Sequence, residues 1–190
     1  MGGITTMKRI LLTSTGFTNK NLEKIFKDNI GKPINMVHAV FVPTAANDEE
    51  SKSILPFCLQ DLTDAGVPEE NIVTYNLDKH IKLDYLLTFD AIYFCGGSET
   101  YLMDAINKIN FGPILLQAVE KGLFYIGVSA GSMIATPSVP NNLGIISNPL
   151  EPHCENNITP CGKLPSKGEP INISDNQAVW ITDSDSIIIE

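Results

Sequence analysis

Short apolar runs alternate with segments of helical periodicity along two thirds of the chain, and this alternation constrains the fold most. The apolar runs occupy residues 8–15, 34–45, 71–77, 90–97 and 123–129. The first intervening segment, 19–30, carries apolar side chains at helical spacing and ends before a glycine. Continuous apolar strands joined by helices are typical of a parallel sheet that is covered on both faces. The sequence therefore predicts an α/β fold with a mostly parallel sheet.

The same reading divides the chain into two parts of different character. Further helices are expected at residues 48–66, with Pro56 as a kink or start, and at 98–110 and 112–122. The chain after residue 136 is rich in proline, asparagine and glycine. We expect loops there, with a short strand at 143–147. Two closing strands within 170–182 and 185–190 should form an antiparallel hairpin that turns at 182–186. We predict a single domain over residues 7–190, preceded by a leader at 1–6.

Composition excludes several classes of partner. The 190 residues are 43% hydrophobic, which suits one compact core, and the net charge is −9. Arg9 is the only arginine, so a nucleic acid partner is not expected. No apolar run approaches the roughly 18 residues that cross a membrane, and no signal-peptide pattern is present. The four cysteines show no metal-ligand spacing, so we expect reduced thiols, no metal and a cytoplasmic protein.

A Gly-Val-Ser-Ala-Gly sequence follows the last of the apolar runs. It places Ser129 between Gly127 and Gly131, with an apolar strand before it and a helix-compatible run after it. This order is what a nucleophile elbow requires, because a sharp turn leaves no room for side chains beside the serine. The alternative is a serine that only caps the following helix.

A serine nucleophile needs a base, and the chain has three histidines. His38 lies in an apolar run and is expected in the core, and His80 lies in a polar connection and is expected in solvent. His153 follows a proline in an irregular segment, which suits a positioned base. The N–H groups of Ala130 and of the glycine pair Gly96–Gly97 can form an oxyanion hole.

Three segments together resemble peptidase family S51, which includes aspartyl dipeptidases and cyanophycinases. They are "FCGGSETYLMDAI", "YIGVSAGSMIATP" and "NPLEPHC", in this order. The resemblance implies a sheet flanked by helices, as in class I glutamine amidotransferases. It also implies Ser129 as nucleophile, His153 as base, and Gly97 and Ala130 as oxyanion donors, with Gly96 as the alternative to Gly97. The implied reaction is hydrolysis of a short peptide through an acyl-enzyme, without a cofactor.

The chain departs from the family pattern in its acidic residues. Peptidase E has an acidic third member between its serine and its histidine, and no Asp or Glu lies between Ser129 and Leu150 here. Several residues remain as candidates for that role: Asn141, Asn142, Glu151, Glu155, Glu169 and Asp175. We predict that Nδ1 of His153 contacts a backbone carbonyl, an asparagine or Glu151 rather than an aspartate, and that activity is therefore low.

A second departure concerns substrate recognition. Aspartyl dipeptidases read the substrate carboxylate with an arginine downstream of the histidine, and only Lys163 and Lys167 are cationic there in this chain. Strict specificity for an N-terminal aspartate is therefore not expected. The function favoured is a serine hydrolase of short peptides or related amides. The alternatives are a weakly active or inactive binding homologue and an amidase of the same fold, and the oligomeric state stays open.

Overall fold

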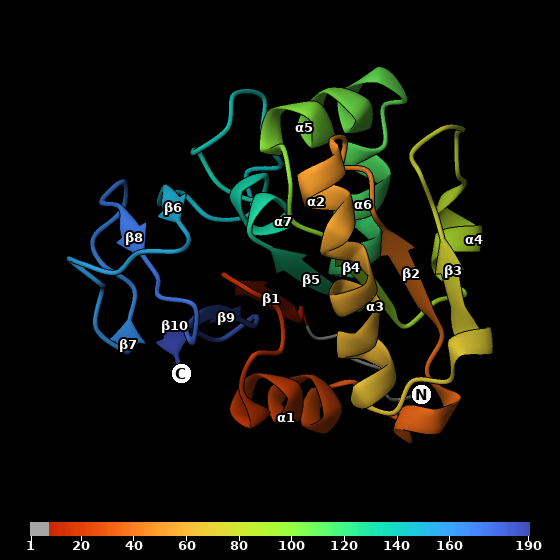
Figure 1. The fold of residues 1–190 in the computed structure, drawn as a ribbon, viewed down its shortest axis with the longest axis horizontal. Helices are drawn as coiled ribbons and strands as arrows, with labels where there is room; N and C mark the ends of the chain where they lie inside the picture. Colours follow the sequence, from red (N-terminus) through yellow and green to blue (C-terminus); the bar gives the residue numbers. More distant parts are fainter. Residues whose placement is uncertain (1–7) are drawn as a thin grey trace.

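The computed structural model describes residues 8–190, so the leader expected at 1–6 lies outside the described residues (Figure 1). The strands are β1 Ile10–Thr13, β2 Ala39–Val42, β3 Ile72–Thr74, β4 Ala91–Phe94, β5 Phe124–Val128, β6 Leu150–Glu151, β7 Gly162–Lys163, β8 Ile171–Asn172, β9 Ala178–Ile181 and β10 Ser186–Ile189. The α-helices are α1 Lys20–Asn29, α2 Glu49–Ser53, α3 Leu55–Asp64, α4 Leu83–Leu86, α5 Glu99–Lys108, α6 Gly112–Glu120 and α7 Ala130–Met133. Two 3₁₀ turns lie at Ile34–Met36 and Glu69–Asn71.

The eight-stranded sheet has the order β3-β2-β4-β5-β1-β9-β10-β7. The five strands from β3 to β1 are parallel, and β9, β10 and β7 continue the sheet in antiparallel pairing. The mixed sheet with antiparallel C-terminal strands confirms the predicted fold class. The hairpin of β9 and β10 turns at the expected residues, since Thr182 N–H donates to Asp185 O.

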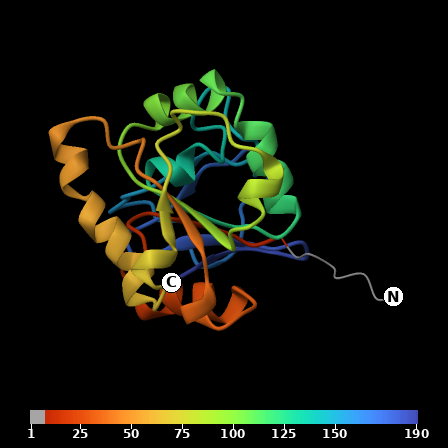
Figure 2. The same ribbon diagram turned by 90° about the vertical axis from the view of Figure 1, so that its right-hand side faces the viewer.

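Both faces of the parallel strands are buried, which explains their continuous apolar runs. In β1, Ile10 and Leu12 pack in one core cluster, while Leu11 between them packs in the other. Helices α4 to α7 cover the first cluster, and α1 and α3 cover the second. Figure 2 shows the sheet between the red-to-yellow helices on one side and the green helices on the other.

The break expected at Pro56 is present, and other elements differ from the expected ones. The helical segment at 48–66 is divided at Ile54 into α2 and α3, because Pro56 occupies the first turn of α3 and cannot supply an N–H to a continuous helix. No strand forms at 143–147, and the strand expected at 34–45 covers only Ala39–Val42. The two-stranded sheet of β6 and β8 was not predicted.

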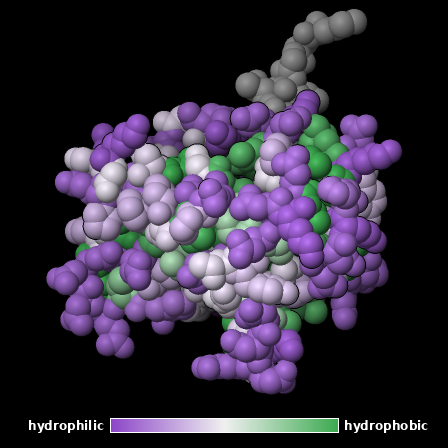
Figure 3. Space-filling view, turned by 90° about the horizontal axis from the view of Figure 1, so that it is seen from above, coloured by the Kyte–Doolittle hydropathy of each residue, from purple (hydrophilic) through white to green (hydrophobic). Residues whose placement is uncertain are grey.

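The remaining polar expectations have mixed outcomes. His38 is exposed just before β2, so its expected burial in the core is wrong, whereas His80 is exposed as expected. All four cysteines are free thiols. No helix of residues 8–190 is long and apolar enough to cross a bilayer. The face in Figure 3 is mostly hydrophilic, with hydrophobic groups showing between polar ones.

Candidate active site

Ser129 occupies the sharp turn between β5 and α7. Its backbone has φ 47° and ψ −106°, a conformation that L-residues rarely adopt. Its N–H donates to Thr13 O of the neighbouring strand β1 at 3.0 Å, which ties the turn to the sheet. The side chain makes no capping hydrogen bond to α7. The alternative of a serine that only caps the helix is therefore wrong.

The two glycines of the turn are required by close packing. A Cβ on Gly127 would lie 2.4 Å from Gly131 O, and a Cβ on Gly131 would lie 2.5 Å from Phe94 O. Contacts this short do not occur for real side chains. The turn can therefore form only with bare backbone at both positions, and this packing holds α7 against the ends of β4 and β5.

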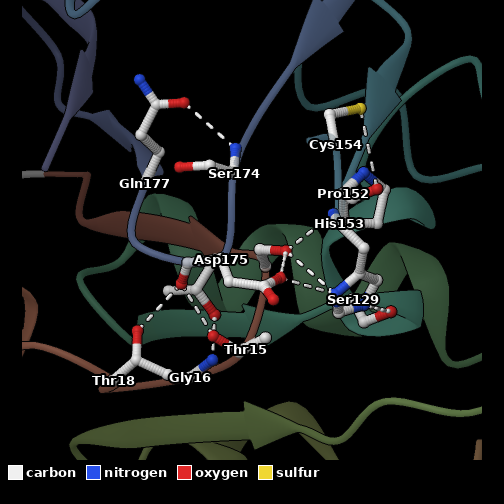
Figure 4. Close-up of polar contacts among 12 residues, drawn as sticks. Thr15, Gly16, Thr18, Ser129, Pro152, His153, Cys154, Ser174, Asp175 and Gln177 are labelled. Carbon is white, nitrogen blue, oxygen red and sulfur yellow. Dashed lines mark hydrogen bonds and ion pairs between the residues drawn. The ribbon is translucent and has the colours of Figure 1, made fainter. Parts of the chain in front are cut away.

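His153 reaches Ser129 from the irregular segment after β6. Its Nε2 lies 3.0 Å from Ser129 Oγ, and its Nδ1 lies 2.8 Å from Asp175 Oδ1 (Figure 4). The sequence prediction that Nδ1 contacts a backbone carbonyl, an asparagine or Glu151 is wrong. Asp175, named only among the wider candidates, provides the carboxylate.

The contacts define which nitrogen of His153 carries the proton. An ionised carboxylate only accepts hydrogen bonds, so Nδ1 donates to Asp175 and Nε2 is left as an acceptor for the Ser129 hydroxyl. This is the tautomer that a general base needs. The His153 and Asp175 side chains are 49% and 60% exposed, so the pair is open to solvent.

Ser14, directly after β1, contacts both His153 and Asp175, and no pattern in the sequence predicted this role. Its side chain is fully buried, its Oγ donates to Asp175 Oδ1 at 3.0 Å, and it accepts the His153 N–H at 2.8 Å. The His153 backbone is held at φ 60°, an uncommon value for a residue with a side chain. One hydroxyl therefore fixes the position of both groups.

The turn that carries Asp175 is bound to the loop after β1. The hydroxyls of Thr15 and Thr18 both donate to Asp175 O, and Asn19 Nδ2 donates to Asn176 O. The signal in the sequence was the pattern Ser-x-x-Gln at 174–177, a polar turn between two strands whose Gln177 side chain accepts the Ser174 N–H. Its position beside Ser129 follows only from the pairing of β9 with β1.

The other candidates for the third member lie elsewhere. Asn142 completes a local turn, donating to Val139 O and accepting the Gly144 N–H. Asn141 is exposed, and so is Glu151 in β6. Glu155 is also exposed, and Glu169 accepts the Ser166 N–H. None of these side chains has a hydrogen bond to His153 in the described part of the chain.

Two backbone N–H groups near Ser129 are candidates for an oxyanion hole. Ala130 is the first residue of α7, where an N–H has no acceptor within the helix. Gly97 has φ 134°, and a Cβ there would lie 2.2 Å from Ala45 O, so only glycine fits. No acceptor for the Gly97 N–H is found among residues 8–190. The roles predicted for Gly97 and Ala130 stay predictions.

A cavity of about 550 Å³ opens beside these groups. Ser129, Gly97 and His153 line it on one side. The rest of the wall comes from α2, α3 and the loop after β1, and includes Asp48, Glu50, Ile54, Phe57 and Asp61. This volume suits a small ligand such as a short peptide segment. Across residues 8–190, no group of three or more His, Cys, Asp or Glu side chains could hold a metal ion.

Asp61 is the most perturbed acid of the cavity wall. Its Oδ2 accepts the Tyr93 hydroxyl at 2.5 Å and the Phe17 N–H at 3.0 Å. Burial raises the pKa of Asp61 to about 6, against the opposing effect of these two hydrogen bonds. A carboxyl kept in a cleft at this energetic cost is typical of a functional position.

Comparison with known proteins gives a consistent family. Residues 10–160 match peptidase family S51. An uncharacterized peptidase of Listeria innocua is 31% identical over 136 residues, which are 70% of this chain and 62% of that protein. Peptidase E of Streptomyces coelicolor is 31% identical over 111 residues, 57% of this chain and 43% of that protein. The chain thus spans about three fifths or less of the length of these curated relatives.

Solved structures match over a longer stretch. A putative peptidase E from Listeria monocytogenes superposes with a TM-score of 0.70 at 20% identity, covering 97% of this chain and 98% of that one. A peptidase from an acI-B1 Actinobacterium gives the same TM-score and identity, covering 97% of this chain and 88% of that one. These two structures share the fold of this chain.

The packing of the turn predicts a large stability difference between two helical glycines. Gly131→Ala should lower the free energy of unfolding by about 2–4 kcal/mol, because the added methyl group meets Phe94. Gly112→Ala is the matched control, since its Cβ would make an ordinary contact at 3.5 Å. Urea unfolding of both variants measures the difference. Equal stabilities would show that the turn can relax around a side chain.

The raised pKa of Asp61 predicts a pH-dependent effect of its removal. The folded state holds the proton more tightly than the unfolded chain, so wild-type stability falls as pH rises from about 4 through about 6. The free energy of unfolding of Asp61→Asn should therefore exceed that of the wild type by about 2 kcal/mol at pH 8 and by little at pH 4. Asp104→Asn is the control, because Asp104 is exposed on α5 and is not among the charges that raise the pKa of Asp61. A gain that is equal at both pH values would contradict the assignment.

Proposed function

The chain belongs to peptidase family S51, and from that premise we propose that it is a serine peptidase of short peptides, with Ser129 as nucleophile, His153 as base and Asp175 as the acid. The observation that carries the proposal is the continuous chain of contacts from Ser129 Oγ to His153 to Asp175, at 3.0 and 2.8 Å. These lengths lie within the reach that proton transfer requires. The substrate is a peptide or a related amide that enters the cavity beside Ser129.

In the first half of the reaction, Ser129 Oγ attacks the carbonyl carbon of the scissile amide while His153 Nε2 takes its proton. The carbonyl oxygen becomes an oxyanion, and the N–H groups of Gly97 and Ala130 are the proposed donors to it. The C–N bond then breaks, and Nε2 returns the proton to the leaving amine. The product is an ester between Ser129 and the acyl part of the substrate.

In the second half, a water molecule replaces the amine. Its proton goes to His153 Nε2, its oxygen attacks the ester carbon, and the Ser129 oxygen leaves and regains the proton. Asp175 remains ionised throughout, and it stabilises the charged imidazolium that forms twice in the cycle. The premise for weak activity was a histidine without a carboxylate partner. Because Asp175 supplies that partner, we expect activity that is not weakened by a missing acid.

The strained turn also favours catalysis over a binding homologue. A hydroxyl with no capping role, held at a rarely populated φ and aimed at an imidazole, is costly to maintain for a structural purpose alone. A cytoplasmic location is part of the proposal, and the four free thiols support it.

A serine-directed fluorophosphonate probe tests the reaction. We expect stoichiometric labelling of the wild type, none of Ser129→Ala, and a rate lowered by about 10³–10⁴ in His153→Ala and Asp175→Asn. Glu151→Gln is the matched control, because this acid lies two residues from His153 and does not contact it; its labelling rate should equal that of the wild type. If the folded wild type is not labelled, Ser129 is not an activated nucleophile, and the chain shares the family fold without the proposed reaction.

Ser14 is proposed as a positioning residue. Ser14→Ala should slow labelling by about 10–100-fold, because it removes one hydrogen bond from Asp175 and one from the His153 backbone. The pH profile of labelling should also shift, since Asp175 then holds the imidazolium less well. Ser132→Ala is the control, because within residues 8–190 this buried hydroxyl donates only to Thr13 O and Gly127 O. If both variants lose stability but neither changes the pH profile, Ser14 has only a structural role.

A further inference from the structure

The cavity beside Ser129 is acidic. Three carboxylates line it, from Asp48, Glu50 and Asp61, and His153 is the only basic side chain in its described wall. No lysine or arginine of residues 8–190 lines it. A carboxylate on the bound substrate would therefore meet like charge, whereas an ammonium or guanidinium group would meet opposite charge.

Asp61 lies deepest among these acids and is held rigidly. The hydrogen bonds from Tyr93 and Phe17 both reach Oδ2. Gly16 packs against the same oxygen, since a Cβ on Gly16 would lie 2.0 Å from it. No ion pair joins Asp61 to a cation in the described chain. Its second oxygen, Oδ1, has no hydrogen bond there either, and can accept one from a ligand in the cavity.

The apolar part of the wall suits a long aliphatic stem. Ile54 and Phe57, from the junction of α2 and α3, line the cavity and are 38% and 69% exposed. Because they line the cavity and are accessible from it, these side chains can bury the methylene groups of a lysine or arginine side chain. Val128, directly before the nucleophile, adds to the same wall.

From these observations we propose that the acyl part of the substrate carries a cationic group that pairs with Asp61, and that acidic first residues are disfavoured. The inference rests on the proposed function, because it assigns the substrate class of the same site. The cation can be the side chain of a lysine or arginine or the free α-ammonium group of the first residue. Asp61 accepts either through Oδ1, and the field of Glu50 and Asp48 favours both.

Hydrolysis of six p-nitroanilides tests the assignment and separates the two sources of the cation. The acyl residues are lysine, norleucine and aspartate, and each is used once with a free α-amine and once with an acetylated α-amine. We expect kcat/KM to be at least tenfold higher for lysine than for norleucine if the side chain binds Asp61. If the α-ammonium group binds Asp61 instead, acetylation of the α-amine should lower kcat/KM at least tenfold for the lysine and the norleucine substrates. Aspartate should be the poorest substrate in either case.

Variants assign the effect to the acid. Asp61→Asn should remove most of the advantage of the cationic substrates over acetylated norleucine, whereas Asp104→Asn, an exposed position on α5, should keep the wild-type ratio. Glu50→Gln, an exposed position, should reduce the same advantage two- to threefold, and it provides the test if Asp61→Asn does not fold. An advantage for the aspartate substrate, or a charge preference that survives both substitutions, would overturn the inference.

The test distinguishes failure of this inference from failure of the proposed function. Hydrolysis of all six compounds at similar rates, lost in Ser129→Ala, overturns the cation preference and leaves the serine peptidase intact. Absence of hydrolysis together with absence of fluorophosphonate labelling overturns both.

Discussion

The structure of the site depends on how closely the turn after β5 packs against its neighbours. Gly131 lies against the end of β4, and Gly127 lies against Gly131, with no space for a methyl group at either contact. The fully buried Tyr125 hydroxyl, from β5, donates to Gly131 O at 2.6 Å and stabilises the same turn. Ser129 keeps its uncommon backbone conformation because this packing leaves no alternative path from strand to helix.

The second half of the site comes from a distant part of the sequence. Asp175 lies 46 positions after Ser129 and reaches it because β9 pairs with β1 in antiparallel fashion. The hydroxyls of Ser14, Thr15 and Thr18 then hold the turn that carries it. The same strand β1 also accepts the Ser129 N–H at Thr13 O. Strand β1 and the loop after it therefore join the serine to the acid, and a shift of the C-terminal strands would separate them.

The sequence predicts what local patterns determine and misses what strand pairing determines. The parallel strands, most of the helices and the turn at Ser129 follow from apolar periodicity and from two glycines. The break between α2 and α3 also follows from a local pattern, since Pro56 predicts a kink or a helix start there. Asp175 was not selected from the sequence, since Asn141, Asn142 and Glu151 lie closer to Ser129 or His153 along the chain. Ser14 was missed because a buried serine at a strand end has no distinctive pattern, and its role appears only when residues 14, 153 and 175 meet.

The electrostatics of the cleft connect stability with specificity. Burial raises the pKa of Asp61 to about 6, so near neutral pH the protein keeps a carboxylate that destabilises the folded chain. A neutral side chain of the same shape would keep an acceptor for Tyr93 and Phe17 without that cost. A substrate cation would supply the missing counter-charge, and binding would then recover part of the stability that the free protein lacks. The acidic wall, together with the lack of an arginine after Arg9, is the basis of the proposed preference for a cationic substrate.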